Sequence, residues 1–126
     1  MDRIDGHVDF GTLSPIVSLT LLSEKDEEIN IPTMVDTGYN GELILPESKI
    51  HKLNLEYVGT IDGELANGEL IEMKLFKGRL QWIGGIVEVA IGSTESESPL
   101  LGTLLLTDCE LHVNFRNGAV EISKAS

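Results

Sequence analysis

The clearest regularity in the chain is an alternation of apolar and polar side chains with a period of two. Val17, Leu19 and Leu21, for example, alternate with the polar Ser18 and Thr20. This period is typical of a β-strand that buries one face. The pattern predicts strands over residues 7–13, 15–22, 29–35, 43–45, 64–66, 69–76, 79–91, 111–115 and 120–122. We therefore expect an all-β fold.

Turn signals separate these predicted strands. Asn67-Gly68 and Asn117-Gly118 are typical of two-residue hairpin turns. Gly84-Gly85 predicts a bend within the strand at 79–91. The acidic run at residues 24–28 predicts a solvated hairpin tip rather than a binding site.

One or two short helices are expected among the strands. Residues 46–53 start with a proline, which is well tolerated in the first turn of a helix. Residues 103–106 follow Gly102 and predict a second short helix. The 126 residues fit one domain, spanning 1–126, that can bury a core without disulfides or metal.

Charge and cysteine content narrow the function classes. The 21 acidic and 9 basic residues give a formal net charge of -12, which opposes binding to nucleic acid or anionic membranes. Cys109 is the only cysteine, so a reducing compartment is the default expectation. We see no secretory signal, and the apolar run at residues 100–106 is too short to span a bilayer. These features predict a soluble, cytoplasmic protein.

The candidate for chemistry is Asp36-Thr37-Gly38. It directly follows the apolar Met34-Val35, and Gly38 permits a sharp turn that would lift the Asp36 side chain out of a sheet. Such a triplet alone occurs by chance in roughly one or two per cent of chains this long. Without supporting motifs, an ordinary turn would be the better interpretation. Downstream, residues 99–106 repeat the order of strand, glycine turn and apolar segment.

Three motifs together resemble the retropepsin-like aspartic proteases. They are Val35-Asp36-Thr37-Gly38, Ala66-Asn67-Gly68 and Leu100-Leu101-Gly102, in the order that the family has them. Residues 36–41 and 100–105 are similar to the bacterial and archaeal single-lobed branch. The resemblance covers residues 7–115. It implies an acid-protease fold, which is a closed all-β barrel forming a single lobe, assembled as a homodimer.

The resemblance also implies roles for individual residues. Asp36 would be catalytic, Thr37 would hydrogen-bond across the dimer axis, and Gly38 would present backbone groups to the substrate. A supporting loop beneath them would consist of Leu100, Leu101 and Gly102.

A mobile flap over an extended peptide or unfolded protein segment would include Ala66, Asn67 and Gly68. Tyr39 replaces a small residue of the retroviral enzymes, so it would narrow the cleft or place a phenol in it. Gly84-Gly85 is a rival position for the flap tip.

The implied chemistry requires a second subunit. Peptide hydrolysis by carboxylates uses two that share one proton, one acting as base on water and the other as acid. The chain holds one Asp-Thr-Gly and no internal repeat, so an identical subunit must supply the second carboxylate. No cofactor is implied. Thr103 and Leu104 replace residues that support the retroviral dimer, and residues 116–126 extend past its usual end, which leaves the interface open.

Three interpretations remain open from the sequence. The first is an aspartic endopeptidase, and the second keeps the fold but only binds peptide. The third is a monomeric β-barrel with no active site. Cys109 and His112 have the spacing of a metal-binding pair, but His7 and His51 lie far away in sequence, so we expect no metal site.

Overall fold

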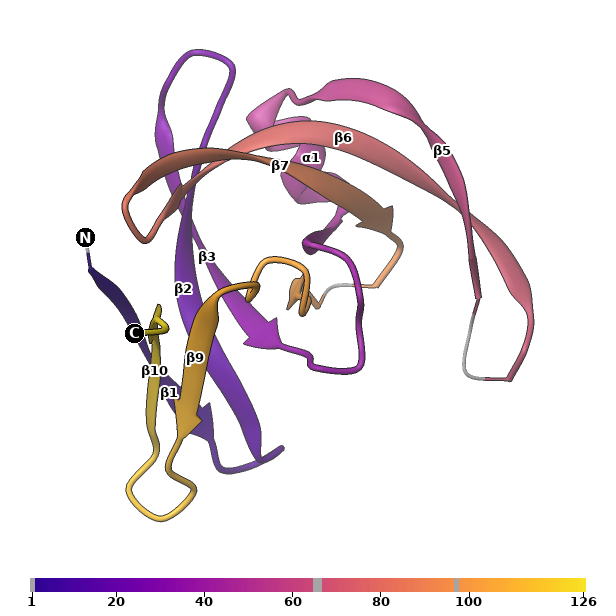
Figure 1. Cartoon of the computed structure of the whole chain (residues 1–126). Helices are drawn as coiled ribbons and strands as arrows, with labels where there is room; N and C mark the ends of the chain where they lie inside the picture. Colours follow the sequence, from indigo (N-terminus) through magenta and orange to yellow (C-terminus); the bar gives the residue numbers. More distant parts are fainter. Residues whose placement is uncertain (1, 65–66, 97) are drawn as a thin grey trace.

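The computed structural model describes residues 2–64, 67–96 and 98–126, and within them the fold is mostly β (Figure 1). The strands are β1 (Arg3–Asp9), β2 (Ser14–Leu22), β3 (Glu28–Val35), β4 (Leu43–Pro46), β5 (Glu56–Glu64), β6 (Leu70–Trp82), β7 (Gly85–Thr94), β8 (Leu100–Leu101), β9 (Cys109–Val113) and β10 (Ala119–Lys124). One helix, α1 (Glu47–Leu53), occurs in this part of the chain. The predicted predominance of strands is confirmed.

The strands form one sheet in the order β5-β6-β7-β4-β8-β3-β2-β1-β10-β9. A further pairing joins β6 to β2, where Leu21 lies opposite Leu80 and Leu22 opposite Arg79. In the part of the sheet that runs from β6 to β2, the first and last strands therefore also pair with each other. β5 and β9 are the two outermost strands of the sheet.

The short strand β8 links two regions that are distant in sequence. It pairs in parallel with the end of β3, where Val35 lies opposite Leu101, and antiparallel with the start of β4, where Leu43 lies opposite Leu101. Asp36, which follows β3, therefore leaves the sheet next to β8, a strand that comes much later in the sequence.

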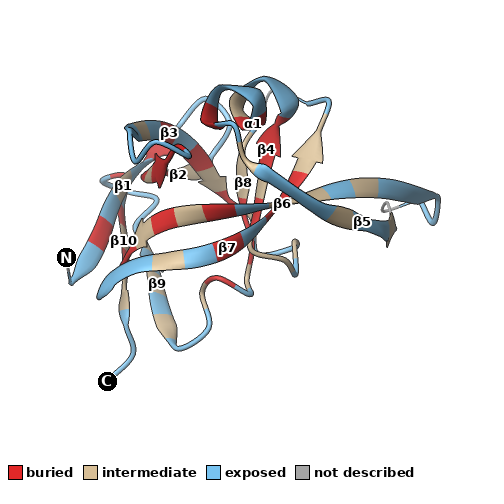
Figure 2. Cartoon of the chain, turned by 90° about the horizontal axis from the view of Figure 1, so that it is seen from above, coloured by how far each residue is buried: buried red, intermediate tan, exposed pale blue. Residues whose placement is uncertain are grey.

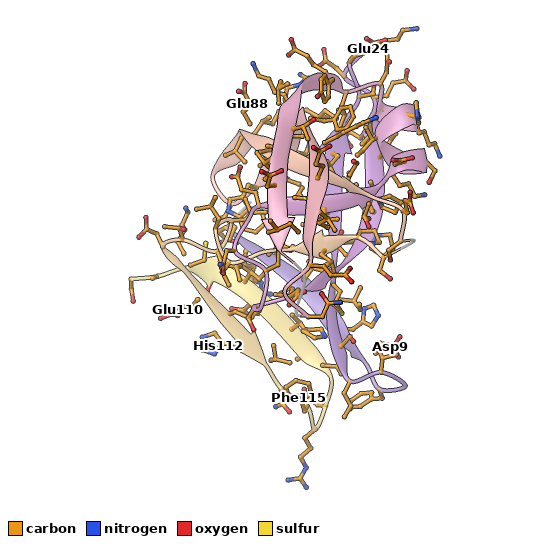
Figure 3. All side chains as sticks on the ribbon, turned by 90° about the vertical axis from the view of Figure 1, so that its right-hand side faces the viewer. Asp9, Glu24, Glu88, Glu110, His112 and Phe115 are labelled. Carbon is orange, nitrogen blue, oxygen red and sulfur yellow. The ribbon has the colours of Figure 1, made fainter. Side chains whose placement is uncertain are left out.

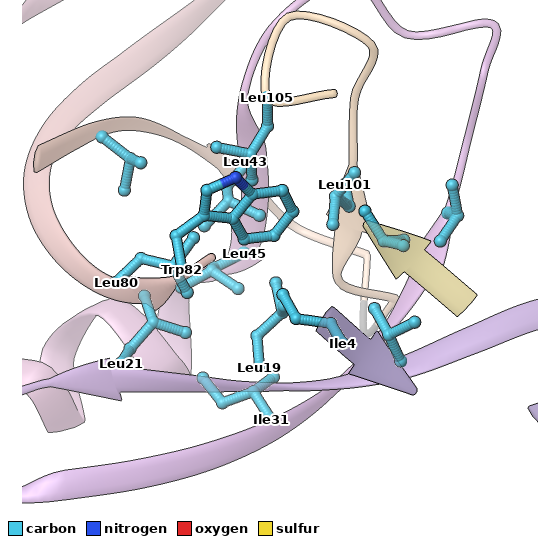
Figure 4. Close-up of a cluster of buried hydrophobic side chains, with 14 of the residues drawn as sticks. Ile4, Leu19, Leu21, Ile31, Leu43, Leu45, Leu80, Trp82, Leu101 and Leu105 are labelled. Atoms are coloured by element: carbon cyan, nitrogen blue, oxygen red, sulfur yellow. The ribbon is translucent and has the colours of Figure 1, made fainter. Parts of the chain in front are cut away.

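The core follows from the alternation seen in the sequence. Val17, Leu19 and Leu21 on β2 are almost completely buried, whereas Ser18 between them is exposed. Figure 4 shows Leu19 and Leu21 packed with side chains from β3, β4, β6 and β8, around the indole of Trp82. Burial of these apolar groups stabilises the fold by roughly 1.5–3 kcal/mol for each large side chain. Figure 2 shows that this burial is concentrated away from β5.

Several predicted strands have different boundaries in the structure, among them 69–76, which is part of β6 at residues 70–82, and 111–115, which is β9 at residues 109–113. The strand predicted at residues 7–13 starts at Arg3 and ends at Asp9, because residues 10–13 form a turn instead of continuing the strand to residue 13. The predicted bent strand at residues 79–91 is wrong. Gly84 and Gly85 lie at the reversal of the β6–β7 hairpin, with φ angles of 91° and 141° that glycine adopts readily.

Both Asn-Gly signals mark hairpins, but the loops are longer than two residues. Glu64 pairs with Leu70, and Val113 pairs with Val120. At the second loop, Gly118 donates its N–H to the carbonyl of Asn114 and has a φ of 81°. The glycines supply left-handed backbone near the end of each loop, so the sequence signal located the reversal and missed its length.

The predicted helix at residues 46–53 is confirmed as α1, for which Pro46 is the N-cap residue. The second predicted helix, at residues 103–106, is instead a series of tight turns. Leu105, Leu106 and Thr107 donate N–H groups to carbonyls three residues earlier. Within the described ranges, no helix combines the length and apolar composition needed to cross a membrane.

Candidate active site

Asp36 lies at the point where β3 leaves the sheet. Its N–H donates to the carbonyl of Leu101 at 2.9 Å, which extends the parallel pairing of β3 and β8 by one bond. Its carboxylate oxygen Oδ1 accepts the N–H of Gly38 at 2.9 Å, and its carbonyl accepts the N–H of Tyr39 at 3.1 Å. The backbone and one carboxylate oxygen are thus fixed, while the side chain remains partly accessible to solvent.

The loop after Asp36 is held by the chain that follows β8. Gly102 donates its N–H to the carbonyl of Glu42 at 2.9 Å. Thr103 donates both its N–H, at 2.8 Å, and its hydroxyl, at 3.2 Å, to the carbonyl of Tyr39. Leu104 donates its N–H to the carbonyl of Gly41 at 3.2 Å. Four bonds therefore fasten residues 39–42 to residues 102–104.

Gly102 is essential to this packing because there is no room for a side chain. A Cβ at position 102 would overlap the carbonyl oxygen of Gly41 and the ring of Tyr39. Gly41 is similarly constrained, since a Cβ there would overlap the phenol of Tyr39. The predicted close approach of backbone at Gly102 is confirmed, and Gly41 is a second such position that the sequence analysis missed.

Tyr39 packs inside this loop. Burial of its phenol, with a smaller contribution from the negative charge of Glu42, raises the pKa of Tyr39 above its ordinary value of 10.0. The Glu42 carboxylate accepts the N–H of Ala90 on β7 at 2.9 Å. The sequence did not predict this bond, because Glu42 and Ala90 are 48 residues apart along the chain. The role of Tyr39 in substrate binding stays a prediction.

A long hairpin of β5 and β6 projects from the body of the molecule (Figure 1). Residues that pair across it share a face, so Ile61 and Met73 lie on one face, with Ile71 and Leu75. The thioether of Met73 packs against Gly92 of β7, so a Cβ at position 92 would overlap the Met73 sulfur. The apolar face of the hairpin therefore turns toward β7.

The opposite face of the hairpin is polar. It carries two cross-strand pairs, Thr60 with Lys74 and Asp62 with Glu72. On the apolar face, Ile61 and Ile71 are nevertheless 45% and 41% exposed. An arm with one apolar face that is only partly covered has the chemistry to cover an apolar ligand.

The predicted flap tip lies at the end of this hairpin. Asn67 accepts the N–H of Glu69 at 3.0 Å through its side-chain oxygen, and Gly68 has a φ of 86°. Ala66 lies outside the described residues. The rival position, Gly84-Gly85, belongs to the neighbouring hairpin of β6 and β7. The flap role of Asn67 and Gly68 remains a prediction.

The structure brings the predicted supporting loop and the predicted catalytic residues together. Leu100 and Leu101 lie in β8 beside Met34 and Val35, and Gly102 follows directly under the Asp36 loop. Thr37 and Gly38 are exposed. A surface cavity of about 600 Å³ lies elsewhere, between Ser23, Asn54 and Arg79, and Asp36 does not line it. In the part of the chain that the structure describes, no three His, Cys, Asp or Glu side chains are grouped to hold a metal ion.

Comparisons with known proteins bear on the fold. No family model matches the sequence, and no curated protein sequence matches it. Among solved structures, the crystal structure of a retropepsin-like aspartic protease from Rickettsia conorii aligns with 98% of this chain and 92% of its own, with a TM-score of 0.53 and 17% identity. The solution structure of the Simian Foamy Virus (mac) protease aligns with 71% of this chain and 91% of its own, with a TM-score of 0.49 and 13% identity. The fold of the chain is retropepsin-like.

Proposed function

We propose that the chain is an aspartic endopeptidase that works as a homodimer, with Asp36 from each subunit forming the catalytic pair. The observation that carries this proposal is the setting of Asp36. Its backbone is bonded to β8, its carboxylate remains partly accessible, and the loop around it is fixed by four backbone-directed bonds. Catalytic groups need such preorganisation, because small displacements cost large factors in rate.

The proposed chemistry needs two carboxylates with different protonation states. Two carboxylates close together cannot both ionise cheaply, so they share one proton and titrate as a pair. The ionised member accepts a proton from water, which attacks the peptide carbonyl. The protonated member donates a hydrogen bond to the carbonyl oxygen and later protonates the leaving amine. One chain offers one Asp-Thr-Gly, so the partner subunit supplies the other Asp36.

The proposed substrate is an extended peptide or an unfolded protein segment. In this proposal, the hairpin of β5 and β6 is the flap, with Asn67 and Gly68 at its tip. Ile61 and Ile71 on its apolar face meet apolar side chains of the peptide, while edge backbone groups bind the peptide main chain. Closure of the flap removes water from the reacting bond.

The remaining residues have supporting roles in the proposal. Leu100, Leu101 and Gly102 hold the Asp36 loop from below, and Thr37 makes a hydrogen bond with the partner loop across the twofold axis. We further propose that the pairing of β6 with β2 closes the central strands into the barrel expected for this fold.

The test is cleavage of an unfolded protein between acid and neutral pH by the wild type and by Asp36→Asn. Asn keeps the shape of the side chain and cannot exchange a proton, so we expect a loss of about 10²–10⁴-fold in rate. A matched control is Asp9→Asn, because Asp9 makes the same carboxylate-to-Gly N–H bond, to Gly11 at 2.9 Å. The control should keep full activity.

Equal cleavage by the wild type and Asp36→Asn would contradict the proposal. Absence of cleavage by a confirmed wild-type dimer, together with binding of unfolded peptide, would favour the peptide-binding interpretation instead.

A further inference from the structure

Residues 39–42, at the end of the Asp36 loop, receive hydrogen bonds from two different parts of the chain. Residues 102–104 donate four of them, all to backbone carbonyls. A fifth comes from β7, where Ala90 donates its N–H to the carboxylate oxygen Oε1 of Glu42 at 2.9 Å. In this set of bonds, Glu42 is the residue that accepts with a charged side chain.

The Glu42 carboxylate acts as an extension of the sheet. β4 and β7 pair in parallel from Leu43 opposite Ile91 onward, so Glu42 and Ala90 directly precede the paired region. The carbonyl of Glu42 is already used, because it accepts the N–H of Gly102 after β8. The side chain of Glu42 therefore supplies the acceptor that Ala90 needs.

The strand β7 brings this bond close to the hairpin of β5 and β6. Ala90 lies in the part of β7 that pairs with β6, and Gly92, two residues later, lies against the thioether of Met73. Met73 belongs to the apolar face of that hairpin. Glu42 therefore joins the loop of the candidate site, the segment after β8 and the base of the proposed flap.

The need to pair a polar group does not explain the Glu42 bond. Ala90 is exposed, so water could accept its N–H in place of the carboxylate. Glu42 is half-buried, and its charge adds to the self-repulsion of a protein whose net charge is -12. A hydrogen bond to an ionised acceptor is, however, shorter and roughly twice as strong as a neutral one. What the carboxylate adds is a fixed distance between residue 42 and β7.

We infer that Glu42 is a positioning residue, whose carboxylate holds the Asp36 loop at a fixed distance from β7 and from the flap that β7 supports. Glu42 does not touch the reacting groups, and it acts by limiting the movement of residues 36–42. This inference rests on the proposed function, because positioning affects cleavage only if Asp36 is catalytic. The order of the loop can nevertheless be measured without cleavage.

The first test separates the length of the Glu42 side chain from its charge. Glu42→Gln keeps the length and an oxygen acceptor but removes the charge. Glu42→Asp keeps the charge but is one methylene group shorter, so it should no longer reach Ala90. We expect Glu42→Gln to keep kcat within about twofold and Glu42→Asp to lower kcat about tenfold. KM and the dimer dissociation constant should change by less than about twofold in both variants.

The matched control is Glu88→Asp, which makes the same shortening on β7 itself. Glu88 forms an exposed ion pair with Lys77 at 3.4 Å, and Figure 3 shows Glu88 at the surface. Exposed pairs of this kind contribute little, so kcat should stay at the wild-type value. An equal loss in Glu42→Asp and Glu88→Asp would overturn the inference. So would a loss in Glu42→Gln that equals or exceeds the loss in Glu42→Asp.

The second test measures amide hydrogen exchange and needs no substrate. The N–H of Ala90 reports the bond to Glu42, and the N–H of Gly38, bonded to the Asp36 carboxylate at 2.9 Å, reports how firmly that carboxylate is held. In Glu42→Asp, exchange at Ala90 should become about tenfold faster and exchange at Gly38 about threefold faster. In Glu42→Gln, both rates should stay within about twofold of the wild type. Unchanged exchange of the core amides of β2 shows that each variant is folded.

The positioning role and the proposed protease fail separately. An unchanged exchange rate at Gly38 in Glu42→Asp would overturn the positioning role, whatever the cleavage assay gives. A wild type that cleaves nothing, with faster exchange at Gly38 in Glu42→Asp, would overturn only the protease. A wild type and a Glu42→Asp variant that cleave equally well would overturn only the positioning role.

Discussion

Asp9-Phe10-Gly11 and Asp36-Thr37-Gly38 form nearly the same turn in two parts of the molecule. In each, the aspartate Oδ1 accepts the glycine N–H at 2.9 Å. In each, the aspartate carbonyl accepts the N–H of the residue three positions later, at 3.3 Å from Thr12 and 3.1 Å from Tyr39. The local sequence therefore determines the local geometry, and that geometry alone does not distinguish the two turns.

The difference lies in what surrounds each turn. Asp9 and residues 10–13 are exposed at a hairpin between β1 and β2 (Figure 3). Asp36 is partly buried, and its backbone is bonded to Leu101. The second turn is hydrogen-bonded to residues 101–104, far along the chain, whereas the first turn meets a distant segment through the packing of Phe10 against Gly118. A carboxylate becomes a candidate for catalysis because of this long-range support, which fixes where the side chain can be.

The largest expected difference is in the tolerance of a methyl group by two glycines, Gly102 in the segment that supports the second turn and Gly11 in the first turn. In Gly102→Ala, the new Cβ overlaps backbone of the Asp36 loop, so unfolding free energy should fall by about 1–3 kcal/mol. Displacement of the loop by about 1 Å should also cost about 100-fold in cleavage rate.

Gly11→Ala is the matched substitution. A Cβ there meets only the Asp9 carboxylate, at 3.2 Å, and unfolding free energy should change by less than about 0.5 kcal/mol. Chemical denaturation with cleavage assays measures both variants. Equal stabilities for the two would contradict the role assigned to the support beneath Asp36.

A smaller difference is expected for two threonine hydroxyls. The Thr103 hydroxyl bonds the Tyr39 carbonyl in a part-buried position, whereas the Thr12 hydroxyl bonds Ser14 at the surface. Thr103→Val should lower unfolding free energy by about 1 kcal/mol, because the carbonyl loses a partner that water replaces poorly. Thr12→Val should have little effect. Thermal unfolding monitored by circular dichroism compares them, and a larger loss for Thr12→Val would count against the account.

The smallest expected difference is in stability at alkaline pH. Tyr39, three residues after Asp36, has an ionisable phenol, whereas the corresponding residue of the first turn is Thr12. The folded state raises the pKa of Tyr39, mainly through burial and secondarily through Glu42. Above pH 10 the unfolded chain ionises this phenol more readily than the folded chain, so stability falls as pH rises through that range. Tyr39→Phe should remove this part of the decline, measured as unfolding free energy from pH 8 to 11. An identical decline in the variant would show that Tyr39 does not contribute.

Much of the fold was predictable because its signals are local. The alternation of Val17, Leu19 and Leu21 identified a strand and its buried face, and Pro46 located the start of α1 within one residue. The apolar residues before Asp36 correctly predicted a strand that ends at the candidate site.

Features that depend on distant residues were missed. β8 has two residues, too few for a period to be visible, and its place between β3 and β4 comes from long-range pairing. The bond from Ala90 to Glu42 has no local signature. Gly84-Gly85 suggested a bend because glycine tolerates several geometries, and the cross-strand pairing of β6 with β7 decides among them.

The most direct test of the account is a mixing experiment between wild type and Asp36→Asn subunits. The chains are mixed at a ninefold excess of the variant, dissociated by dilution and concentrated again, and cleavage is measured per wild-type chain. If two Asp36 carboxylates form one site across a twofold axis, random pairing should reduce this activity to about one tenth. The same excess of Asp9→Asn, which should itself be fully active, should instead raise the activity per wild-type chain about tenfold. Equal activity in the two mixtures would contradict a catalytic site shared between subunits.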